Sequence, residues 1–142
     1  MINHPMKLGP LSLLLGYHLR HASLVFSPDV RRPKGVDRGM IGILSVVSAN
    51  PGINQTSVGK ALRIDPGNLV SLIDKLVDKG FLKRTVRSDD RRVRSLTLTR
   101  AGEAKLKGAV QASLRSEARM LPDFSARDRR TLVALLTKIY RR

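Results

Sequence analysis

Residues 54–99 constrain the fold more than any other part of the chain, because they contain a capped amphipathic helix followed by two short β-rich segments. Asp65 can accept a backbone hydrogen bond as the N-cap, and Pro66 suits the first helical position. Gly80 is a residue type that commonly ends a helix. Between these signals, apolar residues recur at helical spacing, namely Leu69, Leu72, Ile73 and Leu76. The sequence therefore predicts a helix from Asp65 to Gly80 with one buried face.

The opposite face of this helix carries short or polar side chains, as expected for a helix that reads base edges in a DNA major groove. Asn and Ser can hydrogen-bond to bases, and an outward Val can contact a thymine methyl group. Asp74 lies on this face, together with the residues that we predict to contact DNA, Gly67, Asn68, Val70, Ser71 and Lys75. An ordinary solvated helix face has the same pattern, so the helix alone does not identify a DNA-binding protein.

A shorter helix is expected before it, with Asn54 as N-cap and with Val58 and Leu62 facing inward. Gly59 would allow two helices to cross closely at a steep angle, although a tolerated defect explains it equally well. Residues 63–64 leave room only for a tight turn between the two helices. The two helices together have the pattern of a helix-turn-helix.

Two segments rich in β-branched residues follow, Leu82–Arg87 and Val93–Thr99, and predict a hairpin. One buried face would consist of Leu82, Val86, Leu96 and Leu98. Between positions 83 and 94 there are two acidic residues and six basic ones, Lys83, Arg84, Arg87, Arg91, Arg92 and Arg94. We expect these basic side chains to contact phosphates or to enter a narrow minor groove. A basic loop is often only solvated, but the helix-turn-helix beside this one favours DNA contact.

The run Asp90-Arg91-Arg92, followed by Val93, Leu96-Thr97-Leu98-Thr99 and Gly102, resembles the wing signature of the MarR family of bacterial transcriptional regulators. The resemblance extends through residues 65–84, and the order of helices agrees over nearly all 142 residues. It implies a mainly α fold with a small β-wing, in which a winged helix-turn-helix is flanked by N- and C-terminal dimerisation helices. It also implies that Asp90 holds a wing arginine in position.

The chain departs from the family pattern at three positions. Gly59 stands where alanine is common, and Val70 and Ser71 replace the more usual Thr and Arg. These departures concern which DNA sequence is read rather than whether DNA is bound.

Two helices are expected before the helix-turn-helix. The first spans Leu11 to Phe26 and has a broad apolar face. The second begins near Asp37 as N-cap and ends at a turn formed by residues 50–52. Its predicted inward residues are Met40, Ile41, Leu44 and Val47.

Two helices are also expected after the hairpin. Thr99 can cap a helix from Arg100 to Met120, whose apolar stripe would be Leu106, Val110, Leu114 and Leu121. Ser125 and Asp128 resemble a capping box, which would open a last helix with Leu132, Leu135, Leu136 and Ile139 along one side.

This layout predicts three regions: an N-terminal dimerisation helix and linker (1–35), the winged helix-turn-helix (36–99) and C-terminal dimerisation helices (100–142). The winged region cannot cover the apolar faces of the terminal helices, so we expect a homodimer, with a monomeric bundle as the alternative. A two-fold dimer would place its recognition helices about one DNA turn apart on a pseudo-palindromic site.

The composition favours a polyanionic partner, because the formal net charge is +16 and the isoelectric point is near 11.5. Nucleic acid is the first candidate and a membrane surface the second, and the helix-turn-helix favours double-stranded DNA. No apolar run is long enough to cross a bilayer, and the N-terminus lacks the cleavage site of a signal peptide. The absence of cysteine excludes disulfides, thiolate chemistry and Cys-ligated zinc. We therefore expect a cytoplasmic protein without a membrane partner.

No catalytic constellation is apparent, so the chain is not expected to be an enzyme. Its histidines, His4, His18 and His21, lack a nearby carboxylate or cysteine, which predicts no metal site. The acidic pair Asp89 and Asp90 lies among arginines, where charge neutralisation is a sufficient role. No phosphate-binding loop occurs, and no cofactor is expected.

The leading hypothesis is a homodimeric, sequence-specific transcriptional regulator, and the family resemblance implies a repressor. The resemblance also implies release from DNA by a small aromatic or phenolic effector, for which the candidate residues on the first helix are Tyr17, His18, Arg20 and His21. The alternative is a basic architectural or RNA-binding protein without a preferred site or an effector. An enzyme is the third and least supported alternative.

Overall fold

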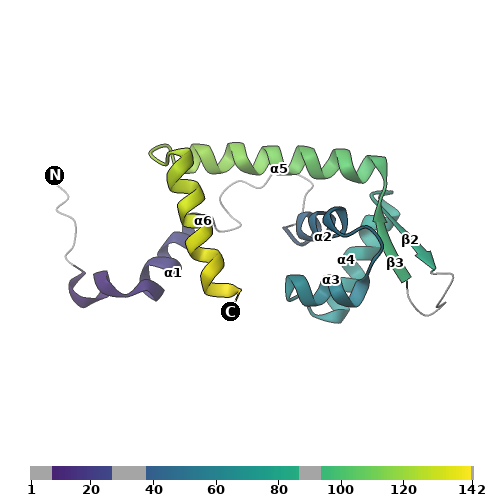
Figure 1. Cartoon of the computed structure of the whole chain (residues 1–142), viewed down its shortest axis with the longest axis horizontal. Helices are drawn as coiled ribbons and strands as arrows, with labels where there is room; N and C mark the ends of the chain where they lie inside the picture. Colours follow the sequence, from purple (N-terminus) through teal and green to yellow (C-terminus); the bar gives the residue numbers. More distant parts are fainter. Residues whose placement is uncertain (1–7, 27–37, 87–93, 142) are drawn as a thin grey trace. The chain divides into compact units, whose positions relative to one another are not determined.

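The structure is a computed structural model that describes residues 8–26, 38–86 and 94–141. The chain forms two compact units, Met1–Arg32 and Pro33–Arg142. The first contains the 3-10 helix η1 (Gly9–Leu13) and the helix α1 (Leu15–Val25). The second contains α2 (Arg38–Ala49), β1 (Ile53–Asn54), α3 (Gln55–Leu62), α4 (Pro66–Asp78), β2 (Leu82–Val86), β3 (Arg94–Leu98), α5 (Arg100–Met120) and α6 (Ala126–Tyr140) (Figure 1).

The continuous helix predicted from Leu11 to Phe26 is wrong, because the chain forms a 3-10 helix and then a separate α-helix. Gly9 has a φ of +54°, and Pro10 favours the tight first turn. Leu14 then adopts an extended backbone with a ψ of 112°, so α1 can begin only at Leu15. The apolar side chains of this unit are exposed in the single chain, with Leu13 at 85%.

Helix α2 forms the centre of the second unit, where it contacts α3, α4, α5 and β3. Its buried stripe consists of Met40, Ile43, Leu44 and Val47. The predicted inward position of Ile41 is wrong, because that side chain is only partly buried and Ile43 is fully enclosed. Positions 40, 43, 44 and 47 follow helical spacing, and residue 41 lies off that stripe. The predicted N-cap at Asp37 lies outside the described residues.

The sheet has three antiparallel strands in the order β1-β3-β2, where the sequence predicted only a two-stranded hairpin. Ile53 pairs with Leu96, and the preceding turn has Gly52 at a φ of +85°. Strand β1 is not apparent from the sequence, because two residues are too few to show alternation. Leu82 and Leu96 are buried, as predicted, and Leu98 is partly buried. The side chain of Val86 lies outside the part of the chain that the structure describes.

The helix-turn-helix has the predicted caps. Asn54 Oδ1 accepts a hydrogen bond from the backbone N–H of Ser57 at 2.8 Å, and the turn between the helices places Arg63 at a φ of +53°. A Cβ atom at position 59 would lie 2.9 Å from Cδ2 of Leu69. Close packing of α3 on α4 therefore accounts for Gly59.

Helix α5 begins and ends as predicted, and Thr99 joins its first turn to the base of the hairpin. Its Oγ1 accepts a hydrogen bond from the backbone N–H of Gly102 at 3.0 Å and donates one to the carbonyl oxygen of Gly80 at 2.6 Å. Within the predicted apolar stripe, Leu106 packs against the core of the second unit and Leu121 is partly buried. Gly102 and Ala109 are buried, whereas Val110 and Leu114 are 39% and 43% exposed in the single chain.

The capping box of α6 is confirmed. The backbone N–H of Asp128 donates to Ser125 Oγ at 3.1 Å, and the backbone N–H of Ser125 donates to Asp128 Oδ2 at 3.0 Å. An ion pair between Arg129 and Glu117 connects α6 to α5. The predicted apolar side of α6 is largely exposed, with Leu135 at 54% and Ile139 at 47%.

Candidate nucleic-acid interface

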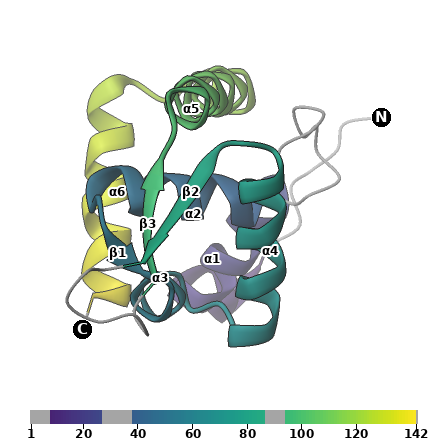
Figure 2. The ribbon, with the colours of Figure 1, turned by 90° about the vertical axis from the view of Figure 1, so that its right-hand side faces the viewer.

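One side of α4 is accessible to a large partner, and the other side anchors the helix. Leu69, Ile73 and Leu76 are buried at 2% exposure or less, which fixes the rotation of the helix about its axis. The five α4 residues predicted to contact DNA are all exposed, namely Gly67, Asn68, Val70, Ser71 and Lys75. Figure 2 shows α4 in the same unit as the antiparallel β2–β3 pair. The fold therefore presents a polar helix face together with a hairpin.

The N-terminus of α4 is held by Asp65 in a way that also involves Asn68. Asp65 Oδ1 accepts the backbone N–H of Asn68 at 3.1 Å, and Asn68 Nδ2 donates to Asp65 Oδ2 at 2.5 Å. The backbone hydrogen bond is the main reason why the pKa of Asp65 lies below its ordinary value, so the carboxylate stays charged. The Asn68 carboxamide keeps its oxygen and a second N–H for a base edge. This double contact was not predicted from the sequence, although the spacing of three residues between Asp65 and Asn68 is a signal for it.

The hairpin residues predicted to contact DNA differ in their surroundings. Lys83 is exposed on β2. Arg84 has a specific neighbour that the sequence analysis did not anticipate, because its Nη2 lies 2.5 Å from Oδ1 of Asp74 on α4. Residues Arg87, Asp90, Arg91 and Arg92 lie outside the described residues, as does the side chain of Arg94.

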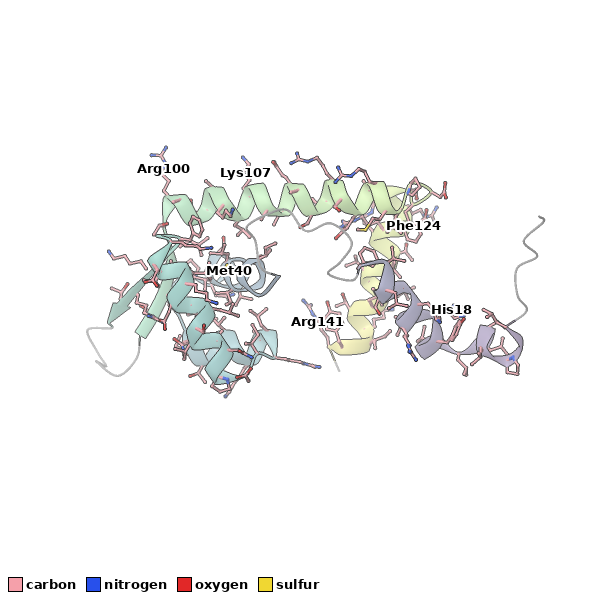
Figure 3. The ribbon with its side chains drawn as sticks, turned by 180° about the vertical axis from the view of Figure 1, so that it is seen from behind. His18, Met40, Arg100, Lys107, Phe124 and Arg141 are labelled. Carbon is pink, nitrogen blue, oxygen red and sulfur yellow. The ribbon has the colours of Figure 1, made fainter. Side chains whose placement is uncertain are left out.

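Positive charge is not confined to the winged region. Residues 38–99 contain eleven basic and five acidic side chains, and residues 100–142 contain eleven basic and four acidic ones. Arg100 and Lys107 project from α5 on the side opposite Met40 of α2 (Figure 3). The net charge therefore supports a polyanionic partner but does not locate the interface.

Three of the four effector candidates come together on α1. The ring centroid of Tyr17 lies 4.2 Å from that of His21 and 5.5 Å from that of His18. His18 Nε2 lies 2.8 Å from the carbonyl oxygen of Ser12, which ties α1 to the preceding 3-10 helix. Arg20 is exposed on the same helix. The cluster is therefore an aromatic group within the first unit.

The described part of the chain supplies neither a metal centre nor a membrane span. Across residues 8–26, 38–86 and 94–141, no group of three or more His, Cys, Asp or Glu residues could hold a metal ion. No helix in the same ranges is both long and apolar enough to cross a bilayer.

A helix-turn-helix followed by an antiparallel hairpin, with an exposed polar face on the second helix, defines a winged helix-turn-helix protein. The model of the MarR family matches residues 40–93. A protein of Thauera aromatica, provisionally named a transcriptional regulatory protein for the hcr operon, is 33% identical over 141 residues, which cover 94% of this chain and 82% of the relative. The chain belongs to the MarR family and is a transcriptional regulator of the MarR type.

Solved structures support the same assignment. The transcriptional repressor CouR bound to a 23-mer DNA duplex is similar over 96% of this chain and 99% of its own, with a TM-score of 0.77 and 33% identity. CouR bound to p-coumaroyl-CoA has a TM-score of 0.70 at 33% identity and covers 96% of this chain and 98% of its own. A MarR variant from E. coli, at 23% identity and a TM-score of 0.68, shares the fold and covers 96% of this chain and 98% of its own.

Proposed function

We propose that this protein is a repressor that binds a pseudo-palindromic DNA site as a homodimer. The exposed face of α4 beside the hairpin is the observation that carries the proposal. The similarity to CouR, a repressor with a DNA-bound structure, supports it. In this proposal the α4 residues Asn68, Val70, Ser71 and Lys75 contact bases. The DNA backbone is contacted by Lys83, Arg87, Arg91, Arg92 and Arg94.

Selection of duplexes from a random pool tests the proposal directly. We expect enrichment of two inverted half-sites whose centres lie about 10 base pairs apart, or a multiple of that distance. A reporter gene placed downstream of the selected site should lose expression when the protein is present. A pool without an enriched motif would favour the alternative of a non-specific architectural protein, and increased expression would identify an activator.

The dimer is supported by apolar side chains that the single chain leaves exposed. On α5 and α6 these are Val110, Leu114, Leu132, Leu135 and Ile139, each 39–54% exposed. Apolar surface on several turns of two connected helices is costly in water, and a second copy can cover it. In this proposal the C-terminal helices form the contact between protomers.

Sedimentation equilibrium separates the dimer from the monomeric bundle. The double variant Leu135→Glu/Ile139→Glu should be monomeric at concentrations where the wild type is dimeric. Thr131→Glu/Arg127→Glu alters exposed polar positions of the same helix and serves as the control. A monomeric wild type would refute this part of the proposal.

A second part of the proposal concerns release from DNA by an aromatic effector. The 33% identical CouR was solved with p-coumaroyl-CoA, and this chain carries an aromatic cluster at Tyr17 and His21. An aromatic acyl-CoA thioester is therefore the first ligand to test. Its acyl ring would contact the Tyr17 and His21 rings, and its phosphates would be attracted to the basic chain.

The effector is added stepwise to a complex of the protein with labelled DNA. Fluorescence anisotropy then measures how much DNA is released. We expect p-coumaroyl-CoA to dissociate the complex, and we expect coenzyme A alone to leave it intact. Tyr17→Ala should raise the effector concentration required without changing DNA affinity. Equal release by coenzyme A alone would show that its negative charge, rather than the aromatic ring, is recognised.

A further inference from the structure

Asp74 and Arg84 connect the recognition helix to the hairpin. Asp74 lies on α4 one turn beyond Val70 and Ser71, and its side chain is 48% exposed. Its Oδ1 atom is 2.5 Å from Nη2 of Arg84 on β2. The ion pair therefore joins the reading face of one element to the strand that begins the wing.

The register of the sheet explains why Arg84 points toward α4. Arg84 is two residues from Leu82 and lies opposite Leu96 on β3, and both leucines are buried. Alternate residues of a strand face the same side, so Arg84 belongs to the inward face while Lys83 and Thr85 face solvent. The Arg84 side chain is only 24% exposed, and within the described part of the chain its buried Nε has no hydrogen-bond partner. An arginine that lies on the inward face of the strand and is paired with a carboxylate does not point outward toward a DNA phosphate.

The pair also affects the net charge of the reading face of α4. An unpaired carboxylate at Asp74 would repel DNA phosphates, and Arg84 neutralises it at close range. An arginine whose charge is already paired within the protein displaces few counterions from DNA. Arg84 can thus support DNA binding without itself neutralising a phosphate.

We propose that Asp74 and Arg84 are a positioning pair that sets the angle of α4 relative to the wing and so contributes to sequence selectivity. The inference rests on the proposed DNA-binding function and gives Arg84 a different role from the phosphate contact that the sequence suggested. Arg84 acts through Asp74, and Asp74 contacts no base.

A double-mutant cycle distinguishes this role from direct phosphate contact. Asp74→Asn, Arg84→Gln and the double variant are compared with the wild type on the selected duplex and on a random duplex at several salt concentrations. Each variant should lower the ratio of specific to random affinity by roughly three- to thirtyfold, and the two changes should be less than additive. Arg84→Gln should also weaken random binding, because it exposes the Asp74 carboxylate.

The salt dependence of the double variant is the decisive measurement. Removal of both charges should leave the slope of log affinity against log salt on random DNA at the wild-type value. A slope reduced by about one unit would mean that Arg84 neutralises a phosphate and would overturn the proposal. An unchanged specificity ratio in all three variants would overturn it equally.

Asp78→Asn is the matched control, because Asp78 is an exposed carboxylate one turn further along α4. It should raise the affinity for random DNA as Asp74→Asn does. The ratio of specific to random affinity, however, should stay at the wild-type value. If Arg84→Gln does not fold, the comparison of Asp74→Asn with Asp78→Asn still decides the question. A wild type that selects no duplex would refute the proposed function, whereas the slope on random DNA would still test the role of Arg84.

Discussion

Gly102 lies directly against the backbone of Phe81, since a Cβ atom at position 102 would be 2.1 Å from the Phe81 carbonyl oxygen. The same oxygen accepts the backbone N–H of Thr99 at 3.1 Å. The first turn of α5 and the base of the hairpin are therefore in contact through main-chain atoms. A backbone contact of this kind cannot be relieved by a change of rotamer.

We expect Gly102→Ala to destabilise the protein, because the added methyl group must displace the main chain of Phe81. Overpacking of this kind typically costs about 1–3 kcal/mol in the free energy of unfolding, which urea denaturation can measure. Gly108→Ala on the same helix is the control, since no atom beyond its chain neighbours and the local helix backbone lies within 4 Å of the added carbon. That substitution should stabilise the protein by about 0.5–1 kcal/mol. Equal effects at the two positions would contradict the close contact at Gly102.

Ser71→Ala should weaken binding to the selected duplex by about 1–3 kcal/mol with little loss on random DNA. The reason is that a hydrogen bond to a base edge contributes only where the correct base is present. Competition binding with both duplexes measures the difference, and Gln111→Ala on α5 serves as a control. The same loss on both duplexes would show that this face of α4 does not read sequence.

Arg91→Ala/Arg92→Ala should weaken binding to every duplex and lower the salt slope by up to about two units, because each phosphate contact releases counterions. The slope is obtained from affinities on random DNA at several salt concentrations. Arg127→Ala/Arg130→Ala removes the same charge from α6 and should have a smaller effect. Identical slopes for the two variants would mean that the total charge, rather than the wing, determines affinity.

Acid should weaken the cap of α6. Hydrogen bonds from the side chain and the backbone of Ser125 hold the pKa of Asp128 below its ordinary value of 3.8. Because the folded-state pKa is the lower one, the stabilisation is complete above the unfolded-state pKa and is lost as the pH falls through the folded-state value. The difference in Tm between the wild type and Asp128→Asn should therefore be constant above about pH 5 and shrink below about pH 4.

A second pair of variants isolates the contribution of Ser125 to this effect. In a Ser125→Ala background, Asp128→Asn should have a Tm difference that depends much less on pH. An undiminished pH dependence in that background would assign the effect to the Ser125 backbone N–H or to another partner, and not to the Ser125 hydroxyl.

Local signals in the sequence predicted where α3, α4, α5 and α6 begin. Asn54, Asp65, Thr99 and Ser125 each cap a helix as predicted, because a cap depends on residues only two or three positions apart. The apolar stripe of α4 was also predicted correctly. These features require no knowledge of distant parts of the chain.

Features that depend on packing between elements could not be predicted in the same way. The strand β1 has two residues and exists only because β3 lies beside it. Ile43 replaces Ile41 in the core because of how α2 sits among its neighbours. Arg84 and Asp74 are ten positions apart, and only the strand register brings them together. The predicted contacts of Arg91 and Arg92 lie outside the described residues.

The two hydrogen bonds of Thr99 have a mechanical consequence for signalling within the protein. The Thr99 hydroxyl is bonded to the backbone N–H of Gly102 in the first turn of α5 and to the carbonyl oxygen of Gly80 before β2, so it holds the start of α5 to the base of the hairpin. A twist applied far along α5 would therefore reach the wing as the motion of a stiff lever, without a flexible relay between them.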